Sequence, residues 1–429
     1  MKFKKTTTIL LALSLLLGTI LIPCSVSANP QTYINSYLSE KLEKNNLSGV
    51  IYVTKNGEVL GEAARGMKNA EEEITTDTLF PIGSNSKQFC AVAVLLLQEQ
   101  GKLSVDNKIS EYFPEYTKAK DATIKNLLTM RAGIPDHTNV GLINGEYTLS
   151  ATATKEENQQ TILNWLYEKE LDFAPDTDFN YTNTSYFLLS MIVEKVSGQS
   201  YSDYIKENIL VPLKLDNTGF YEEFLTHPDL AQHNVPTDKP IDPELKGLTQ
   251  GCGDLVSNAK DMDKWMTSLK ECTLLSEESI TEMTTSYTPD SGYGYGLVVY
   301  DDGSLYHNGG IVCYLSVTLT YPEEGLNFFI ISSDYNTGSP FVIDRITSEI
   351  DKDLAVNRTF GDVNGDDKIT VKDATLIQKS SAKISKLSAV ELICGDVNED
   401  NKVNVKDATA IQKHVAKIDT KLPFGELIY

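Results

Sequence analysis

The chain has 429 residues, 41% hydrophobic and 23% charged, which is an ordinary globular composition with room for two or three domains. Its formal net charge of −22 disfavours nucleic acid and anionic membrane as partners, because both are themselves negative. The cysteines after residue 28 are widely spaced and form no CxxC pair, so neither a disulfide framework nor a zinc site is expected. Cys90 and Cys313 lie among apolar residues and are expected in the core.

The N-terminal segment is typical of a secretory signal peptide. A lysine-rich start is followed by a mainly apolar run over 9–22, which is too short to span a bilayer, and small residues end at Ala28. Cys24 follows Pro23, whereas a lipoprotein site needs a small residue there. We therefore predict a signal peptide over 1–28 and a secreted protein without a transmembrane segment.

The apolar spacing then predicts secondary structure in chain order. A helix over 31–44 precedes a hairpin of strands 49–54 and 59–64 around Asn56-Gly57. Further helices are predicted from residue 84 to about 101 and over 156–169, 186–196 and 259–269, with Gly198 as a helix C-cap. Residues 125–130 form a short segment of periodic apolar residues. Strands are predicted over 293–300, 304–309, 314–321 and 326–333, followed by a helix over 341–354.

Strands thus lie at both ends of residues 29–357, and helices fill the middle. Antiparallel strands from the two ends can pair in one sheet, with helices on its faces and a helical lobe between them. We predict an α/β (α+β) fold of this kind for residues 29–357.

A serine and a lysine three residues apart mark the start of the second helix. Ser84 and Lys87 would share a helix face, so the lysine amine could reach the serine hydroxyl. A serine needs a neighbouring base to act as a nucleophile, and a lysine can serve because burial favours its neutral form. The same residues could also form an ordinary capped first turn.

Two later segments carry polar residues that could complete such a site. Tyr181 could share a proton with the serine and the lysine, and Asn183 could hydrogen-bond a substrate amide. A turn that ends in a helix N-cap would look the same. His307, at a strand end before Gly309 and Gly310, could carry a proton, although a strand bulge with an incidental histidine is the alternative.

In this order, the motifs resemble those of the class C β-lactamase-related serine hydrolases. That family includes β-lactamases, DD-carboxypeptidases, D-amino-acid amidases and esterases, and the resemblance covers essentially all of 29–357. The matching segments are Phe80-x-x-Gly83-Ser84-x-Ser86-Lys87, Leu127-Leu128-Thr129-x-x-x-Gly133-Ile134-Pro135, Tyr181-x-Asn183, Gly253-Asp254-Leu255-x-Ser257 and His307-x-Gly309-Gly310.

The resemblance implies a role for each of these residues. Ser84 would be the acylated nucleophile and Lys87 its base, while Tyr181 would relay a proton to the leaving group. Asn183 would orient the substrate. No cofactor is implied for catalysis.

The strand-edge motif bears on the substrate. The resemblance implies that His307 lines this wall of the site and that the backbone N–H groups of Ser84 and Gly310 form an oxyanion hole. Where β-lactamases carry Lys-Thr-Gly, this chain has His307-Asn308-Gly309. This favours a peptide or ester substrate, with a true β-lactamase or a non-catalytic penicillin-binding-like protein as alternatives.

The last part of the chain contains a duplicated acidic loop. Residues 361–379 recur at 395–413 with 14 of 19 positions identical. Each copy places oxygen side chains at loop positions 1, 3, 5 and 12, with a lysine carbonyl at position 7, a spacing that suits Ca²⁺. Position 6 is not glycine and position 12 is Asp, unlike the common EF-hand. The predicted ligands of two calcium ions are Asp362, Asn364, Asp366, Lys368 and Asp373, and Asp396, Asn398, Asp400, Lys402 and Asp407.

Residues 361–429 resemble a small α-helical type I dockerin with two EF-hand-like loops, joined to the first domain by a linker over 358–360. This implies folding on calcium and docking to the cohesin domain of a scaffold protein, as in a cellulosome, through residues near Val371-Lys372 and Val405-Lys406 and two helices. A plain calcium sensor is the alternative. Because scaffold-bound enzymes of this kind commonly act in polysaccharide degradation, the resemblance makes an ester substrate more plausible.

Overall fold

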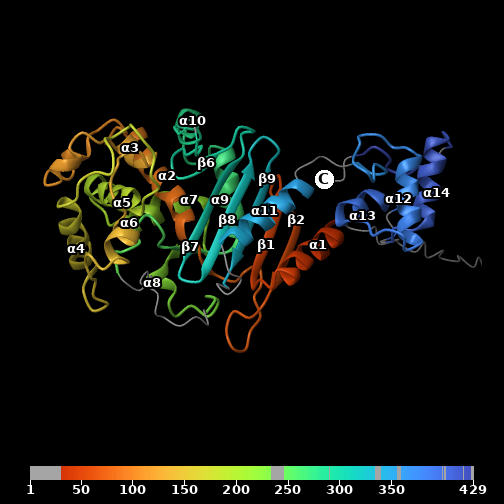
Figure 1. The fold of residues 1–429 in the computed structure, drawn as a ribbon, viewed down its shortest axis with the longest axis horizontal. Coiled ribbons are helices and arrows are strands. Elements are labelled where there is room, and N and C mark those ends of the chain that lie inside the picture. The colour runs from red at the N-terminus through yellow and green to blue at the C-terminus, as the bar shows by residue number, and fades with distance from the viewer. Residues whose placement is uncertain are drawn as a thin grey trace, which may run out of the picture.

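The computed structural model describes residues 30–232, 246–288, 290–333, 340–354, 359–398, 400, 402–418 and 420–426 (Figure 1). The predicted signal peptide lies outside the described residues. None of the helices described is both long enough and apolar enough to act as a membrane span.

A six-stranded antiparallel sheet, in the order β2-β1-β9-β8-β7-β6, forms the centre of the larger domain. Its first pair comes from the N-terminal hairpin, and β1 pairs along its length with β9. Strands from the two ends of the domain therefore share one sheet, as predicted. The strands are β1 (Gly49–Lys55), β2 (Glu58–Arg65), β6 (Val298–Val299), β7 (Leu305–Ile311), β8 (Tyr314–Tyr321) and β9 (Leu326–Ser332).

Helices cover both faces of this sheet, because successive side chains of its strands point to opposite faces and are apolar on both. Ile51 and Val53 face the helices α1 (Pro30–Lys44) and α11 (Pro340–Leu354), whereas Val50 and Tyr52 join the larger core of the helical lobe. That lobe contains α2 (Ser86–Glu99), α3 (Ile124–Leu128), α4 (Lys155–Tyr167), α5 (Asn183–Ser197), α6 (Tyr201–Ile205), α7 (Val211–Leu213), α8 (Tyr221–Phe224), α9 (Ala259–Lys270) and α10 (Glu277–Met283). Gly198 caps α5 in the left-handed region, and Cys90 and Cys313 are buried, as predicted.

The predicted strand over 293–300 is wrong for most of its length. Only Val298–Val299 is strand, because Gly296 has a φ of +77° and the Gly294 amide donates to the Leu297 carbonyl at 2.8 Å, which makes a turn. The resulting β6 pairs with β7 only at Leu305 and Tyr306. Within the described residues, the rest of β7 therefore lacks a strand partner along that edge.

A second, three-stranded sheet lies under the start of α2. It consists of β3 (Phe80–Pro81), β5 (Leu255–Ser257) and β4 (Gly219–Phe220), with β5 in the middle. Phe80 pairs with Ser257 and Pro81 with Val256. This pairing brings the turn before residue 255 next to the residues that follow Pro81.

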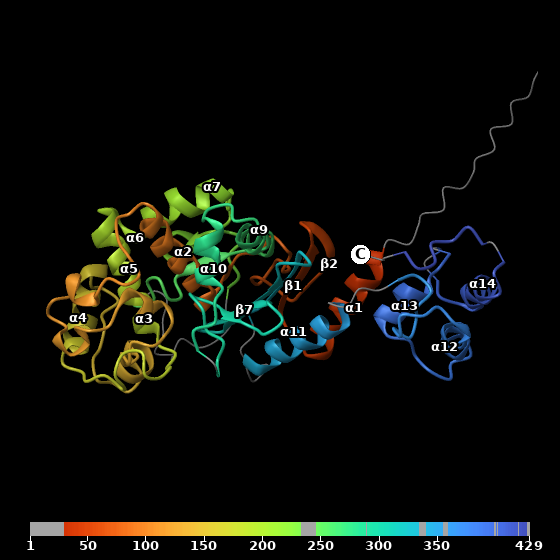
Figure 2. The same ribbon diagram turned by 90° about the horizontal axis from the view of Figure 1, so that it is seen from above.

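The C-terminal module contains α12 (Val371–Ser381), α13 (Ala389–Gly395) and α14 (Val405–Val415). It is built around a small core in which Ile377 and Ile411 occupy equivalent places in the two repeats. In both ribbon views α13 lies beside α1 of the larger domain (Figures 1 and 2). Residue 358 of the predicted linker lies outside the described residues, whereas the Phe360 amide donates to the Glu426 carbonyl near the end of the chain.

Candidate active site and calcium loops

Ser84 lies in a short 3-10 turn, Gly83–Asn85, that leads directly into α2. Lys87 is completely buried and its Nζ donates to Ser84 Oγ at 2.9 Å. The same Nζ donates to Asn183 Oδ1 at 2.9 Å and to the Cys252 carbonyl at 2.8 Å. Among the described residues Lys87 forms no ion pair, so two neutral oxygens, from Asn183 and Cys252, hold its amine beside the serine hydroxyl.

Asn183 is the first residue of α5, and the helix N-cap is Thr182. The Asn183 side chain is bound at both ends, because its Oδ1 accepts from Lys87 and its Nδ2 donates to Thr138 Oγ1 at 2.9 Å. Asp136 supports this arrangement by accepting from the Asn183 backbone amide at 2.6 Å and from Thr138. The asparagine is therefore fixed beside the lysine.

Strand β7 runs past Ser84 at backbone contact distance. A Cβ atom on Gly309 would lie 2.1 Å from the Ile82 carbonyl oxygen and 3.0 Å from the Ser84 nitrogen. A Cβ atom on Gly83 would lie 2.8 Å from the Gly310 nitrogen. The two backbone nitrogens predicted to form the oxyanion hole therefore belong to segments that touch each other, and only glycine permits this approach.

This contact predicts a difference between two neighbouring glycines. We expect Gly309→Ala to lower kcat/KM at least tenfold and to destabilise the protein by about 1–3 kcal/mol, because the added methyl group overpacks the strand against the Gly83–Asn85 turn. Gly310→Ala is the matched control, since its Cβ atom would meet only Leu315 Cδ2, at 3.5 Å. Ester hydrolysis and urea unfolding of both variants test this, and equal effects would contradict it.

Tyr181 and His307 line the other side of the lysine. The Tyr181 side chain is exposed, and Lys87 Nζ lies 4.9 Å from its ring centroid. His307 is buried and its Nδ1 lies 2.5 Å from the Asn308 carbonyl oxygen. Because a carbonyl only accepts, Nδ1 carries the proton, and Nε2 accepts from the Tyr293 hydroxyl at 3.1 Å.

Burial lowers the pKa of His307 to about 3, so this ring is neutral at pH 7. In the unfolded chain the pKa returns to about 6.5, so the unfolded state binds more protons between pH 6.5 and 3. The contribution of His307 to the free energy of unfolding therefore decreases as the pH falls through this window.

Through His307, the free energy of unfolding of the wild type should fall by about 2 kcal/mol between pH 7 and pH 5. We expect His307→Gln to lack this part of the decrease. Urea unfolding followed by tryptophan fluorescence reports on this domain, since both tryptophans, Trp165 and Trp265, lie in it. His137 is also buried and its pKa is lowered by burial, so it too makes the free energy of unfolding decrease as the pH falls. His307→Gln leaves that decrease unchanged. An identical pH dependence in variant and wild type would contradict the prediction.

The two acidic loops at the C-terminal end fold their oxygen side chains inward. Asp373 and Asp407, at position 12, are completely buried, and Asp362 and Asp396, at position 1, are nearly so. In the first loop the Asp366 amide donates to Asp362 Oδ1 at 3.1 Å and to Asn364 Oδ1 at 2.9 Å. The second loop repeats both bonds from Asp400, at 3.1 Å to Asp396 and 3.0 Å to Asn398.

This donor set fits a hard cation. Burial, followed by the charges of Asp396 and Asp400, raises the pKa of Asp407 to about 6. Asp367, at position 6 of the first loop, takes the left-handed conformation that glycine usually supplies there. In the part of the chain described, no three His, Cys, Asp or Glu side chains alone come close enough to hold a metal. Each loop would therefore also need its asparagine oxygen and the carbonyl of Lys368 or Lys402.

The beta-lactamase family profile matches residues 34–348, which is most of the chain. The chain belongs to the β-lactamase-fold serine hydrolase family. The type I dockerin profile matches residues 360–416, so the chain also carries a C-terminal dockerin domain. Both predicted resemblances and the mixed fold are thereby confirmed.

Known relatives agree with this placement. PbpX of Bacillus subtilis (strain 168), whose name places it among the penicillin-binding proteins, is 28% identical over 305 residues, covering 70% of this chain and 74% of PbpX. The octameric penicillin-binding protein homologue from Pyrococcus abyssi has a TM-score of 0.64 at 28% identity, covering 74% and 77% of the two chains. D-amino acid amidase from Ochrobactrum anthropi SV3 shares the fold with a TM-score of 0.61 at 24% identity, covering 75% and 98%.

Three contributors to the hydrolase site were missed by sequence reasoning: the Cys252 carbonyl, the Tyr293 hydroxyl and the Asp136–Thr138 pair that holds Asn183. The glycines on both sides of Cys252 were the one sequence signal for a close backbone approach.

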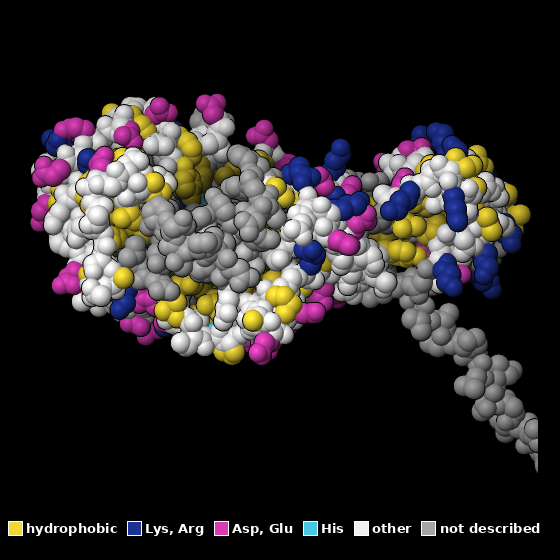
Figure 3. All heavy atoms as spheres, turned by 60° about the horizontal axis from the view of Figure 1, so that its bottom comes forward, with side chains coloured by type: hydrophobic (Ala, Val, Ile, Leu, Met, Phe, Trp, Pro, Cys, Tyr) yellow, Lys and Arg dark blue, Asp and Glu magenta, His cyan; other side chains and the backbone are white. Residues whose placement is uncertain are grey.

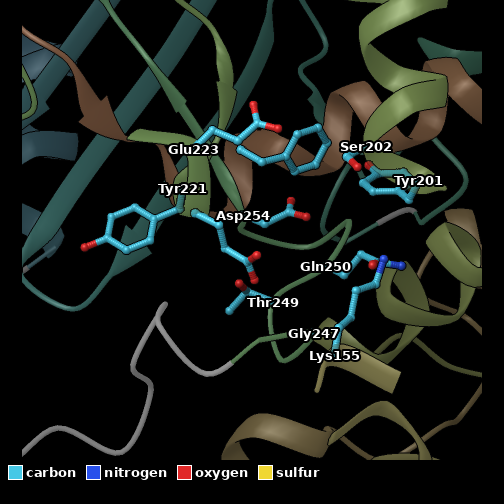
Figure 4. A pocket seen from close by; sticks show the side chains of 11 residues that line it. Lys155, Tyr201, Ser202, Tyr221, Glu223, Gly247, Thr249, Gln250 and Asp254 are labelled. Carbon is cyan, nitrogen blue, oxygen red and sulfur yellow. The ribbon is translucent and has the colours of Figure 1, made fainter. Parts of the chain in front are cut away.

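The turn that contains Cys252 also borders a cavity of about 120 Å³. This cavity is lined by residues that include Thr249, Gln250 and Asp254 and by none of the predicted catalytic side chains (Figure 4). Burial raises the pKa of Asp254 to about 7.

Proposed function

We propose that residues 29–357, once a signal peptide over 1–28 is removed, act as a secreted serine hydrolase through an acyl-enzyme on Ser84, and that the dockerin, residues 361–429, tethers this enzyme to a cohesin-bearing scaffold. The hydrogen bond between Lys87 Nζ and Ser84 Oγ, at 2.9 Å, carries the catalytic half of this proposal. The amine belongs to a buried lysine without an ion-pair partner in the described residues, and it lies within hydrogen-bond distance of the hydroxyl whose proton it would accept as the base.

In this mechanism Lys87 accepts the Ser84 proton as Oγ attacks the substrate carbonyl carbon. The N–H groups of Ser84 and Gly310 stabilise the oxyanion, each by about 3 kcal/mol. Tyr181 passes the proton to the departing alcohol or amine, which leaves an ester on Ser84. Water, deprotonated through the same residues, then attacks that ester and releases the acid, while Asn183 keeps the Lys87 amine in place.

The neutral His307 favours a peptide or an ester over a β-lactam. A β-lactam carboxylate would be expected to meet a cation at this strand, where Lys-Thr-Gly enzymes have lysine. His307 supplies no charge at pH 7, since burial holds its pKa near 3. The substrate class that we propose is therefore a D-amino peptide, as for a DD-carboxypeptidase, or an acyl ester, such as those on polysaccharides.

Hydrolysis of a short panel tests this assignment. We expect a p-nitrophenyl ester or a peptide ending in D-Ala-D-Ala to be turned over faster than nitrocefin, and we expect the turnover to disappear in Ser84→Ala. Nitrocefin as the best substrate would instead identify a β-lactamase. Acylation without any turnover would identify a non-catalytic penicillin-binding-like protein.

The dockerin presents two similar faces for a cohesin. Val371 and Val405 begin α12 and α14 and are each 57% exposed, followed by the exposed Lys372 and Lys406. Figure 3 shows lysine and apolar side chains together on the surface of this module. We propose that these faces bind a cohesin once calcium occupies the loops. Failure to bind any of a panel of type I cohesins in millimolar calcium would favour a plain calcium sensor.

A further inference from the structure

The dockerin is packed against its own hydrolase domain. Three α13 residues, Val390, Ile393 and Cys394, are at most 6% exposed and belong to the same apolar core as Ile34 and Leu38 of α1. Both ribbon views show the two helices side by side (Figures 1 and 2). The outward faces of α12 and α14 stay exposed, so this contact does not compete with a cohesin for them.

A polar contact joins this interface to the second calcium loop. Tyr33, in the first turn of α1, donates from its hydroxyl to Asp396 Oδ2 at 3.2 Å. Asp396 is the position-1 ligand of that loop, and its other oxygen accepts from the Asp400 amide. In the first loop the equivalent Asp362 accepts from the amides of Asp366 and Asp367, both within its own loop.

We propose that the hydrolase domain is a binding partner of the dockerin and that Tyr33 is a positioning residue for calcium in the second loop. This inference rests on the proposed binding of calcium by both loops. A hydrogen bond to the outer oxygen of a ligating carboxylate fixes its orientation, and its loss typically costs about 10–100-fold in metal affinity. Because such coupling is reciprocal, calcium in the second loop also strengthens the docking of α13 on α1.

The consequence is an asymmetry between two loops of nearly identical sequence. The second loop, which Tyr33 supports, binds calcium more tightly in the full chain, and the first loop binds it independently of the hydrolase. The dockerin is then held in one orientation on the enzyme when calcium is present, and it is released more readily when calcium is removed.

Calcium titration calorimetry of the full-length protein tests this, with Tyr33→Phe compared with Tyr37→Phe. Tyr37 lies one turn further along α1, and its hydroxyl donates to Asp353 within the hydrolase domain. We expect Tyr33→Phe to weaken one of two calcium sites about tenfold and Tyr37→Phe to weaken neither. Asp362→Asn weakens the first loop and Asp396→Asn weakens the second, so combining each with Tyr33→Phe identifies the loop that Tyr33→Phe affects. An effect on the first loop would overturn the inference.

Hydrogen exchange of α1 supplies a second readout. We expect amides in 30–44 to exchange faster in EGTA than in calcium, and we expect Tyr33→Phe to reduce this difference. The inference would be overturned if Tyr33→Phe left both calcium affinities unchanged and α1 were equally protected in calcium and in EGTA. The proposed calcium binding itself would survive that result. A wild-type chain that takes up no calcium would overturn the proposed calcium binding as well, so the two failures are distinguishable.

Discussion

Replacement of Lys87 by methionine is expected to lower kcat/KM about 10²–10⁴-fold, the range typical of a positioned general base. Methionine has nearly the same length and fills the buried volume, but it cannot accept the Ser84 proton. It also leaves Asn183 Oδ1 and the Cys252 carbonyl without their shared donor. Each acceptor left without a donor costs about 1–3 kcal/mol, so urea unfolding of the variant must accompany the kinetics to show that the protein assayed is folded.

The control is Lys125→Met, at a lysine whose Nζ lies 4.6 Å from the centroid of the Tyr287 ring. It contacts none of the proposed catalytic residues through a hydrogen bond in the described structure. Steady-state kinetics with one ester substrate should separate the two variants, because Lys125→Met is expected to match the wild type. A Lys87→Met enzyme within tenfold of the wild type would remove the lysine from the mechanism.

Removal of calcium is expected to unfold the dockerin while the hydrolase domain stays folded. The apolar core of the module is small, and domains below about 70–80 residues often depend on a staple such as a structural metal. Without a cation, its buried carboxylates repel one another, as the raised pKa of Asp407 indicates. Circular dichroism in EGTA should therefore show a loss of helix, whereas the tryptophan fluorescence of the hydrolase domain should change little.

Two substitutions separate the loops. Asp373→Ala and Asp407→Ala each remove a completely buried position-12 ligand, and each should abolish calcium uptake by its own loop. Both should also lower the thermal transition of the dockerin in calcium, while the transition of the hydrolase domain stays in place. A dockerin transition at the same temperature in EGTA and in calcium would contradict the role of these loops.

The sequence predicts the parts of this molecule that local spacing determines. The helix after Thr182, its Gly198 cap and the β1–β2 hairpin follow from apolar periodicity and from residues with special backbone preferences. The Ser84–Lys87 hydrogen bond follows from the i, i+3 spacing on a helix start. The duplicated loops are visible because the two copies retain the same ligands.

Other parts depend on contacts that spacing cannot show. The Cys252 carbonyl reaches Lys87 across 165 residues, because β5 pairs with β3 beneath the start of α2. The segment 293–300 has the composition of a strand, but Gly294 and Gly296 turn the chain there and leave the β7 edge available to the site. The Tyr33–Asp396 bond joins residues 363 positions apart, in two domains that the sequence shows only as neighbours.

Intact-protein mass spectrometry after labelling tests the central claim most directly. The full-length protein and its Ser84→Ala variant would each be incubated with an active-site phosphonate and, separately, with a fluorescent penicillin. The proposed mechanism predicts a single adduct on the wild-type chain, mapped to the peptide that contains Ser84, and no adduct on Ser84→Ala. An unlabelled wild type, or an adduct that persists in Ser84→Ala, would contradict an acyl-enzyme on this serine.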